Sequence, residues 1–579
     1  MNTLVKNVRF FNGTKEKSII TDIRIKDGKI FEIGPSLAAP DGDRIIDGTG
    51  KWMMPGFIDT HTHYDAEILL SPGLYESVRH GITTVVLGCC SISMVYNEPE
   101  DCADIFTRVE SVPRNVVLPL LEEVKSWKTP EGYKNYLKDL PLGPNVSAFI
   151  GHSDIRIKVL GLENAVDKNY VPTEHEQKEM ERHLEESLKA GFLGLSMMTT
   201  RWDKLDGTRF RSHPLPSTYA RLKEFRGLNK VLRKWRRVLQ GAPDIVTKYN
   251  MFFFLWESMG ILKKNLKTTL ITLADAKSNP ILYRFVIVLT TFFNKILKAD
   301  FRWQSLPCQF QVFADGMDLV IFEEFRSGEE ALHFTSYAER RKLFANQEYR
   351  KRFKRDYETK FSPRVWHRDF HDAFILSCPD GSLIGKSFGE IALAQNTHAV
   401  DAFLDLIDKF GTELRWTTVI ANHRKRVLEK IVSSETTIMS FSDAGAHLRN
   451  MAFYNFPLQL LKMVQDASKE GRSFMTLEEA VWKVTGQLGS WFNLDAGFLK
   501  MGKRADFVII DPNGLGQDVL AITEAHFPEM NNMKRLVNRN DKAVLHVFIN
   551  GREIFENGIF KNGYGTEKGF GQFLEAIEC

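Results

Sequence analysis

The feature that most constrains the fold is an alternation of short apolar runs with helical patterns over several hundred residues. Runs such as 83–87, 146–150 and 417–421 are typical of short buried strands, and 174–190 has the apolar spacing and charged faces of a helix. This alternation favours a parallel α/β sheet, because parallel strands need helix-length crossovers. We expect an α/β fold with a (β/α)8 TIM-like barrel over residues 54–500, the architecture that fits this length best.

The two ends of the chain differ from the middle. Residues 5–11 and 543–550 read as strands, and Asn550-Gly551 is a strong hairpin signal. We expect a small β-sandwich domain, built from residues 1–53 together with residues 501–579, beside the barrel.

Residues 220–360 interrupt the alternation, and we expect them to form an inserted, lid-like helical subdomain. Within this region, 221–240 has apolar residues at helical spacing and many Lys and Arg residues elsewhere, so it is a basic amphipathic helix. We expect this helix to cover the barrel with its cationic face in solvent. Contact of Arg221–Gln240 with a membrane surface or an anionic partner is the alternative.

Composition excludes several classes of protein. Hydrophobic residues make up 43% and charged residues 26%, which excludes disordered, collagen-like and coiled-coil chains. A formal net charge of +4 over 579 residues gives no indication of nucleic-acid binding. The longest apolar runs, 251–256 and 285–293, are far shorter than the roughly 20 residues of a membrane-spanning helix. With no apolar signal core in the first 15 residues and only six cysteines, we expect a cytoplasmic protein.

The motif that carries chemistry is His61-Thr62-His63, which follows the apolar segment 53–58. Alternate residues of a strand point to the same side, so both imidazoles face one point. At the carboxyl end of a barrel strand that point is the mouth of the barrel, where one metal ion can bind both side chains.

Together with three later segments, this motif resembles the amidohydrolase superfamily, and most closely its D-aminoacylase (N-acyl-D-amino-acid deacylase) branch. The segments are Gly88-Cys89-Cys90, Ala190-Gly191-Phe192-Leu193-Gly194-Leu195-Ser196 and Ser442-Asp443-Ala444-Gly445. The resemblance covers nearly the whole chain in outline, and the return at 499–508 into the small β domain is also a family trait.

The resemblance implies a divalent metal, usually zinc, that activates water to hydrolyse a non-peptide C–N bond. By resemblance, His61 and His63 bind the metal, and Asp443 is the catalytic base and acid as well as a ligand. Cys90 occupies the register of the family's cysteine ligand, while a pair of buried structural thiols at Cys89 and Cys90 is the alternative.

The chain departs from the branch where two later metal histidines are expected. Neither a Thr-His-Met-Arg-like nor a Ser-His-His-Lys-like segment occurs, and no histidine lies between His213 and His333. We therefore expect one zinc ion rather than two, with a second site of unusual ligands as the alternative.

Three further histidines are candidates for supporting the metal ligands or contacting substrate. His152 follows the run 146–150, His423 follows the run 417–421, and His447 lies four residues after Asp443. For His152 a purely structural hydrogen bond is the alternative.

We expect the substrate to be a small-molecule amide, an N-acyl amino acid or a related compound, with the Phe- and Leu-rich 220–360 region shaping a pocket for an apolar acyl chain. Two alternatives stay open. One is a mononuclear hydrolase or deaminase of a cyclic amide, an imide or an exocyclic amine. The other is a catalytically degraded relative that only binds a small molecule. A homo-oligomer also stays open.

Overall fold

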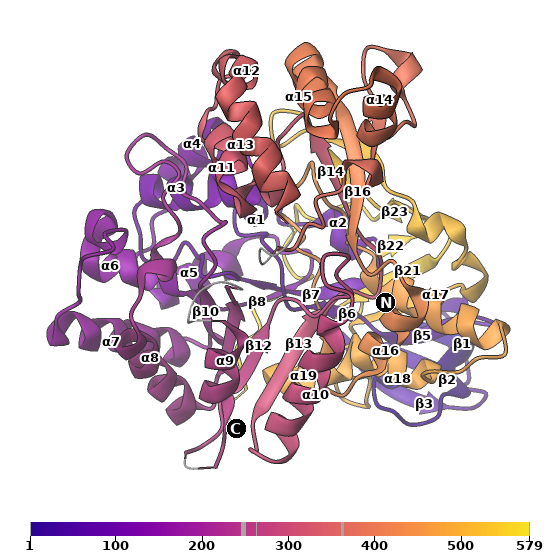
Figure 1. The fold of residues 1–579 in the computed structure, drawn as a ribbon. Helices are drawn as coiled ribbons and strands as arrows, with labels where there is room; N and C mark the ends of the chain where they lie inside the picture. The colour runs from indigo at the N-terminus through magenta and orange to yellow at the C-terminus, as the bar shows by residue number, and fades with distance from the viewer. Residues whose placement is uncertain (1, 245–249, 262, 360–363, 578–579) are drawn as a thin grey trace.

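The computed structural model describes residues 2–577 except 245–249, 262 and 360–363. Its framework is a set of short parallel strands that are covered by helices (Figure 1). One parallel sheet holds β6 (Phe57–Asp59), β7 (Ile82–Leu87) and β8 (Asn145–Ala148). The other has the order β17-β13-β12-β11-β10-β9, and its strands are β9 (Ile150–Gly151), β10 (Gly194–Met198), β11 (Val238–Ala242), β12 (Lys267–Leu270), β13 (Asp300–Ser305) and β17 (Thr437–Met439).

The parallel strands are short and almost wholly buried, as strands covered on both faces must be. Helices follow most of them: α6 (His152–Ala165), α7 (Glu174–Lys189), α8 (Leu222–Trp235), α9 (Met251–Ser258) and α10 (Leu282–Lys295). The capping box of Thr173 and Glu176 fixes the start of α7. The parallel α/β fold is thus confirmed, whereas the strands are divided between two sheets, so the closed (β/α)8 barrel stays a prediction.

Residues 220–305 do not leave the strand–helix alternation, in contrast to the expectation from the sequence. They supply β11, β12 and β13, three neighbouring strands of the larger parallel sheet. Strands β12 and β13 were not recognised from the sequence. Lys267–Leu270 and Asp300–Ser305 contain polar residues, so neither segment reads as an apolar run.

The segment that leaves the parallel sheets begins at β14 (Phe310–Asp315), which forms an antiparallel sheet with β15 (Ala373–Ser377) and β16 (Arg415–Ala421). The prediction that 417–421 belongs to the parallel sheet is therefore wrong, because an apolar run does not specify the direction of its partners. Five helices accompany this sheet and lie with β14 and β16 at the top of Figure 1: α11 (Arg326–His333), α12 (Tyr337–Ala345), α13 (Gln347–Glu358), α14 (Phe388–Gln395) and α15 (Ala399–Phe410).

Strands from both ends of the chain share one mixed sheet of the order β23-β22-β21-β18-β5-β1-β2-β3, with β4 beside β1. The two ends meet where β5 (Trp52–Pro55) pairs antiparallel with β18 (Phe507–Ile510). The other strands are β1 (Thr3–Phe10), β2 (Ile19–Lys26), β3 (Lys29–Gly34), β4 (Arg44–Asp47), β21 (Val544–Ile549), β22 (Arg552–Glu556) and β23 (Ile559–Phe560). Among the described residues, no helix combines the length and the apolar character that crossing a membrane requires.

Candidate metal centre

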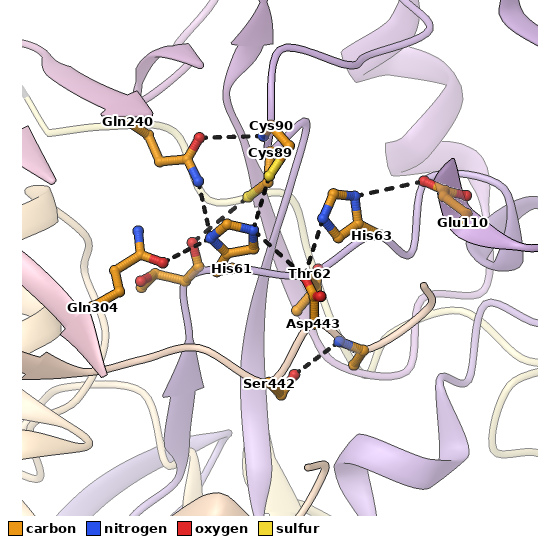
Figure 2. A network of polar contacts seen from close by, with 12 residues as sticks. His61, Thr62, His63, Cys89, Cys90, Glu110, Gln240, Gln304, Ser442 and Asp443 are labelled. Atoms are coloured by element: carbon orange, nitrogen blue, oxygen red, sulfur yellow. Dashed lines mark hydrogen bonds and ion pairs between the residues drawn. The ribbon is translucent and has the colours of Figure 1, made fainter. Parts of the chain in front are cut away.

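Four side chains converge at the carboxyl ends of the parallel strands (Figure 2). His61 and His63 follow β6, Cys90 follows β7, and Asp443 follows β17. The Nε2 atoms of His63 and His61 lie 3.2 Å and 3.6 Å from Asp443 Oδ1, and Cys90 Sγ lies 3.3 Å from His61 Nε2. A tetrahedral zinc ion with bonds of about 2.0–2.3 Å places neighbouring ligand atoms about 3.3–3.6 Å apart, so these three contacts have lengths close to those between ligands of one ion.

The two cysteines of the Cys89-Cys90 pair point to different surroundings. Cys90 turns into the left-handed region with φ 52°, and its sulfur joins a group of possible ligand atoms with His61 and His63 that all lie within 4.8 Å of one another. Cys89 instead lies in an apolar cluster with Val86 and Phe149. This placement supports Cys90 as the ligand and Cys89 as a structural thiol.

The loop after β17 is tied to the His-x-His segment through its backbone. Asp443 N donates to His61 O at 3.2 Å, and His63 N donates to Ala444 O at 2.7 Å. Gly445 has φ 93°, and a Cβ at this position would lie 2.5 Å from the carbonyl oxygen of His63. Only glycine therefore allows the loop to approach the histidines so closely.

A buried side-chain contact reinforces this tie. Ser442 Oγ donates to Asp59 Oδ2 and accepts from Ala444 N at 3.0 Å. Burial raises the pKa of Asp59 to about 8. The loop that carries Asp443 is thus anchored to the end of β6, two residues before His61.

The electrostatics of the cluster suit a cation. Burial lowers the pKa of His61 to about 4, so this imidazole is neutral at pH 7 and has a lone pair to offer. Burial acts to raise the pKa of Asp443, but the hydrogen bond with His63 and the charges of His63 and His61 outweigh it and hold the pKa below its ordinary value. Burial also raises the pKa of the Cys90 thiol well above its usual value, and a bound metal is what would deprotonate it.

Two glutamines that the sequence analysis missed hold the far side of His61. His61 Nδ1 lies 2.7 Å from Gln304 Oε1 on β13 and 2.9 Å from Gln240 Nε2 on β11. With Nε2 facing an ion, Nδ1 carries the ring proton and donates it to Gln304. Gln240 Oε1 in turn accepts from Cys90 N at 3.2 Å, so Gln240 contacts both ligand segments. Neither glutamine had a strand signal in the sequence, because Gln240 ended the helix expected over 221–240 and Asp300–Ser305 does not read as an apolar run.

His63 also has a buried acidic neighbour that was missed. Its Nδ1 atom lies 3.8 Å from Glu110 Oε1, at the end of α3 (Pro99–Glu110), as Figure 2 shows. Glu110 is fully buried, and neither of its carboxylate oxygens has a hydrogen-bond partner among the described residues. Asp65 and Asp203 add negative charge near His63. Nothing in the local pattern around these three acids pointed to the site.

The other predicted histidines lie in different surroundings. His152 has Nδ1 2.9 Å from Ser217 Oγ and Nε2 2.9 Å from Glu224 Oε1, so both ring nitrogens are engaged within the protein, as its structural alternative requires. His423 follows the antiparallel strand β16 and lies 4.0 Å from Asp275 with 34% of its side chain exposed.

His447 lies near the cluster. The Asp443 charge acts on it, although burial is the larger influence and lowers the pKa of His447 below its ordinary value. Its backbone N–H donates to the carbonyl oxygen of Glu110 at 3.1 Å. A supporting or substrate role for His447 stays a prediction.

A second ligand group of three side chains occurs elsewhere among the described residues, at His546, Glu553 and Glu556 of the mixed sheet. Arg44 Nη2 lies 3.0 Å from Glu556, and Lys561 Nζ lies 3.2 Å from Glu553. Cations of the protein already neutralise these carboxylates, so this group does not resemble a metal site.

Comparison with known proteins finds one kind of relative over the whole chain and another over a part of it. The chain is 46% identical over 586 residues to the uncharacterized protein Rv2913c of Mycobacterium tuberculosis, and the match covers 100% of this chain and 96% of that protein. It is 33% identical over 178 residues to the N-acyl-D-aspartate deacylase of Alcaligenes xylosoxydans xylosoxydans, which covers 31% of this chain and 32% of that one. No family model matches the chain.

Among solved structures, the chain is similar to the N-acyl-D-glutamate deacylase of Bordetella bronchiseptica in complex with zinc and a phosphonate inhibitor. The TM-score is 0.64 at 20% identity, over 99% of both chains. A D-aminoacylase crystal structure gives a TM-score of 0.62 at 18% identity, again over 99% of both chains. The chain therefore belongs to one family with Rv2913c, and it has the fold of these deacylase and D-aminoacylase structures.

Proposed function

We propose that this protein is a metal-dependent amidohydrolase that removes the acyl group from an N-acyl amino acid or a related amide. The observation that carries the proposal is that possible ligand atoms of His61, His63 and Cys90 lie within 4.8 Å of one another, with Asp443 3.2 Å and 3.6 Å from the two imidazoles. Imidazole and thiolate donors together suit zinc, and three protein ligands leave a fourth position of one ion open for water.

His61, His63 and Cys90 would hold the ion, with Asp443 beside it. A bound divalent ion supplies Lewis acidity, which lowers the pKa of a water to about 7 and polarises the amide carbonyl. Gln304 fixes the ring of His61, since its Oε1 atom lies 2.7 Å from His61 Nδ1 and accepts the ring proton.

Asp443 is the group that moves protons in this proposal. Its side chain is 12% exposed, whereas that of His61 is fully buried, so Asp443 is the member of the pair that solvent and substrate reach. An ionised carboxylate accepts a proton from the attacking water and then delivers it to the leaving nitrogen, which cannot depart as an amide anion. The hydrogen bond with His63 holds the carboxylate in place for both transfers.

Three phenylalanine rings beside the cluster favour a substrate with an apolar acyl group. The ring of Phe441 lies 5.1 Å from that of His61, measured between centroids, and Phe310 lies 6.4 Å from Phe441. Phe453 packs 5.2 Å from Phe310. Phe310 is partly exposed and lies within residues 220–360, the region expected to shape the acyl pocket.

We also propose that the two parallel sheets belong to one barrel over residues 54–500, with the strands from residues 1–53 and 501–579 in a separate small domain. Support comes from the gap between β17 and β6, where Thr60 N donates to Ser440 O at 3.1 Å and Thr62 forms a parallel bridge with Ala444. On the other side, one residue separates β8 from β9.

The test is release of free amine from N-acetyl and N-octanoyl amino acids of both configurations by the zinc-loaded full chain. We expect metal-dependent hydrolysis, and Phe310→Ala should raise KM for the octanoyl more than for the acetyl substrate. His526→Asn, at an exposed position, is the matched control and should behave as the wild type. A chain that retains stoichiometric metal but hydrolyses none of these compounds would contradict the proposal.

A further inference from the structure

Helix α10 presents a continuous apolar stripe to solvent. Its large apolar side chains recur at spacings of three and four residues, which places them on one face. They are Ile281 at 69% exposure, Phe285 at 52%, Val288 at 69%, Phe292 at 49% and Ile296 at 62%. The opposite face is buried and holds the helix on β13, where Trp303 Nε1 donates to Thr290 Oγ1 at 2.8 Å.

A second helix extends this apolar surface. Phe252 and Trp256 of α9 are 49% and 57% exposed, and Ile261 just after the helix is 53% exposed. The ends of the two helices meet, because Gly260 N donates to Leu297 O at 3.1 Å. Both helices lie beside β12 and β13 in the lower part of Figure 1. Patches of this kind, formed from many large apolar side chains, mark interaction sites rather than ordinary surface.

The charges around this surface are nearly all positive. Between residues 258 and 299 the sequence has seven Lys and Arg residues and one acidic residue, Asp275. Asp275 is fully buried and is held by Arg424 at 2.8 Å. The exposed cations around the apolar stripe are Lys264, Arg284, Lys295 and Lys298. From outside residues 258–299, Glu435 brings one acidic group near this surface, with Oε2 3.8 Å from Lys295 Nζ.

On the neighbouring basic helix α8, by contrast, cations are paired with acidic residues of the protein. Its Lys234 lies 2.6 Å from Glu185 of α7, and its Lys223 lies 3.3 Å from Glu174. Its apolar residues Phe225, Leu228 and Leu232 are buried. In the sequence analysis, contact with a membrane surface is the alternative for 221–240. That contact is therefore better supported for α9 and α10 than for α8.

We propose that α9 and α10 form a docking surface for an anionic phospholipid bilayer, into which the exposed apolar side chains insert while the cations contact headgroups. An apolar face with a rim of Lys and Arg is the arrangement that lies in the interface of anionic membranes. A second copy of the chain fits this surface less well. A two-fold contact would bring the same cations of both copies together, with no exposed acidic residue between 258 and 299 to pair with them.

The test is co-sedimentation of the full chain with vesicles of phosphatidylcholine alone or of phosphatidylcholine and phosphatidylglycerol in equal parts. We expect binding to the anionic vesicles only, and weaker binding as salt is raised. The variant with Phe285→Gln, Val288→Gln and Phe292→Gln should bind about a hundredfold more weakly. Lys264→Gln with Lys298→Gln should weaken binding without removing it.

The matched control is Leu393→Gln with Ile559→Gln, two side chains that are 73% and 71% exposed on other parts of the protein. It should bind as the wild type, and thermal unfolding should show that every variant is folded. Equal binding of the triple variant and the wild type would overturn the proposal. The proposal would also be overturned if the wild type sedimented with neither kind of vesicle. It would be overturned as well if the wild type bound no vesicles but formed a dimer, and the triple variant were monomeric. None of these readouts depends on hydrolytic activity.

Discussion

Replacing Gln304 by leucine should weaken metal binding without unfolding the protein. Gln304 Oε1 lies 2.7 Å from His61 Nδ1, and this contact favours the tautomer in which Nε2 is free to bind a metal. In Gln304→Leu the remaining polar neighbour of Nδ1 is the amide nitrogen of Gln240 at 2.9 Å. That donor favours the opposite tautomer, with the ring proton on Nε2, where the metal would bind.

The magnitudes follow from the contacts of Gln304. Loss of a partner that orients a metal-bound histidine costs about 10- to 100-fold in metal affinity, which is about 1.4–2.7 kcal/mol. The metal-free protein loses one hydrogen bond, worth about 1 kcal/mol. It also loses a buried amide nitrogen that has no partner among the described residues, and such a group costs about 1–3 kcal/mol. The relieved penalty is at least as large as the lost hydrogen bond, so the free energy of unfolding should change by about 2 kcal/mol or less.

The assay is zinc affinity by competition with a chromophoric chelator, together with urea unfolding of the metal-free protein. Gln240→Leu is the matched control, because it should lower the stability of the protein while leaving zinc affinity close to that of the wild type. It removes the acceptor of the buried Cys90 N–H and should cost about 1–3 kcal/mol of stability, while His61 keeps Gln304. Wild-type zinc affinity in Gln304→Leu, or a stability loss above about 3 kcal/mol in that variant, would refute the reasoning.

Three further predictions concern single side chains. Asp443→Asn should lower kcat by about 100- to 10,000-fold with an unchanged circular dichroism spectrum, because the amide cannot accept the proton; a wild-type kcat would remove the proposed role. Cys90→Ser should weaken zinc binding by at least about tenfold, whereas Cys89→Ala should not, as equilibrium dialysis against zinc would show; equal losses in both would contradict the ligand assignment. Burial lowers the pKa of Lys483 to about 7, so above that pH the unfolded chain binds more protons than the folded one and the free energy of unfolding rises towards pH 10. Lys483→Met should reduce that rise by up to about 1.4 kcal/mol per pH unit in urea unfolding, and an unchanged slope would show that Lys483 is charged in the fold.

The side chains of the candidate metal centre were predicted in two ways. The alternation of a strand was enough to predict that His61 and His63 face one side, whereas Cys90 and Asp443 were predicted by resemblance to segments of the D-aminoacylase branch. Parallel strands bring their carboxyl ends to the same edge, so the four side chains meet once the α/β fold is correct. The structure adds that Cys90, not Cys89, faces the histidines.

The surroundings of the ligands were not predictable in the same way. Gln240 and Gln304 reach His61 from strands β11 and β13, and their role depends on tertiary neighbours that no local pattern specifies. The run 417–421 has the periodicity of a strand but lies in the antiparallel sheet, because periodicity does not encode the strand's partners. His152 follows a parallel strand as expected, yet Glu224 engages its ring nitrogen.

The central claim is that His61, His63 and Cys90 hold one catalytic metal ion beside Asp443. Elemental analysis of the purified full chain, combined with X-ray absorption spectroscopy of the bound metal, tests it most directly. The account predicts about one zinc ion per chain, with one sulfur neighbour at about 2.3 Å and nitrogen or oxygen neighbours at about 2.0–2.1 Å. A chain that binds no divalent metal, or a bound ion without a sulfur neighbour, would contradict it.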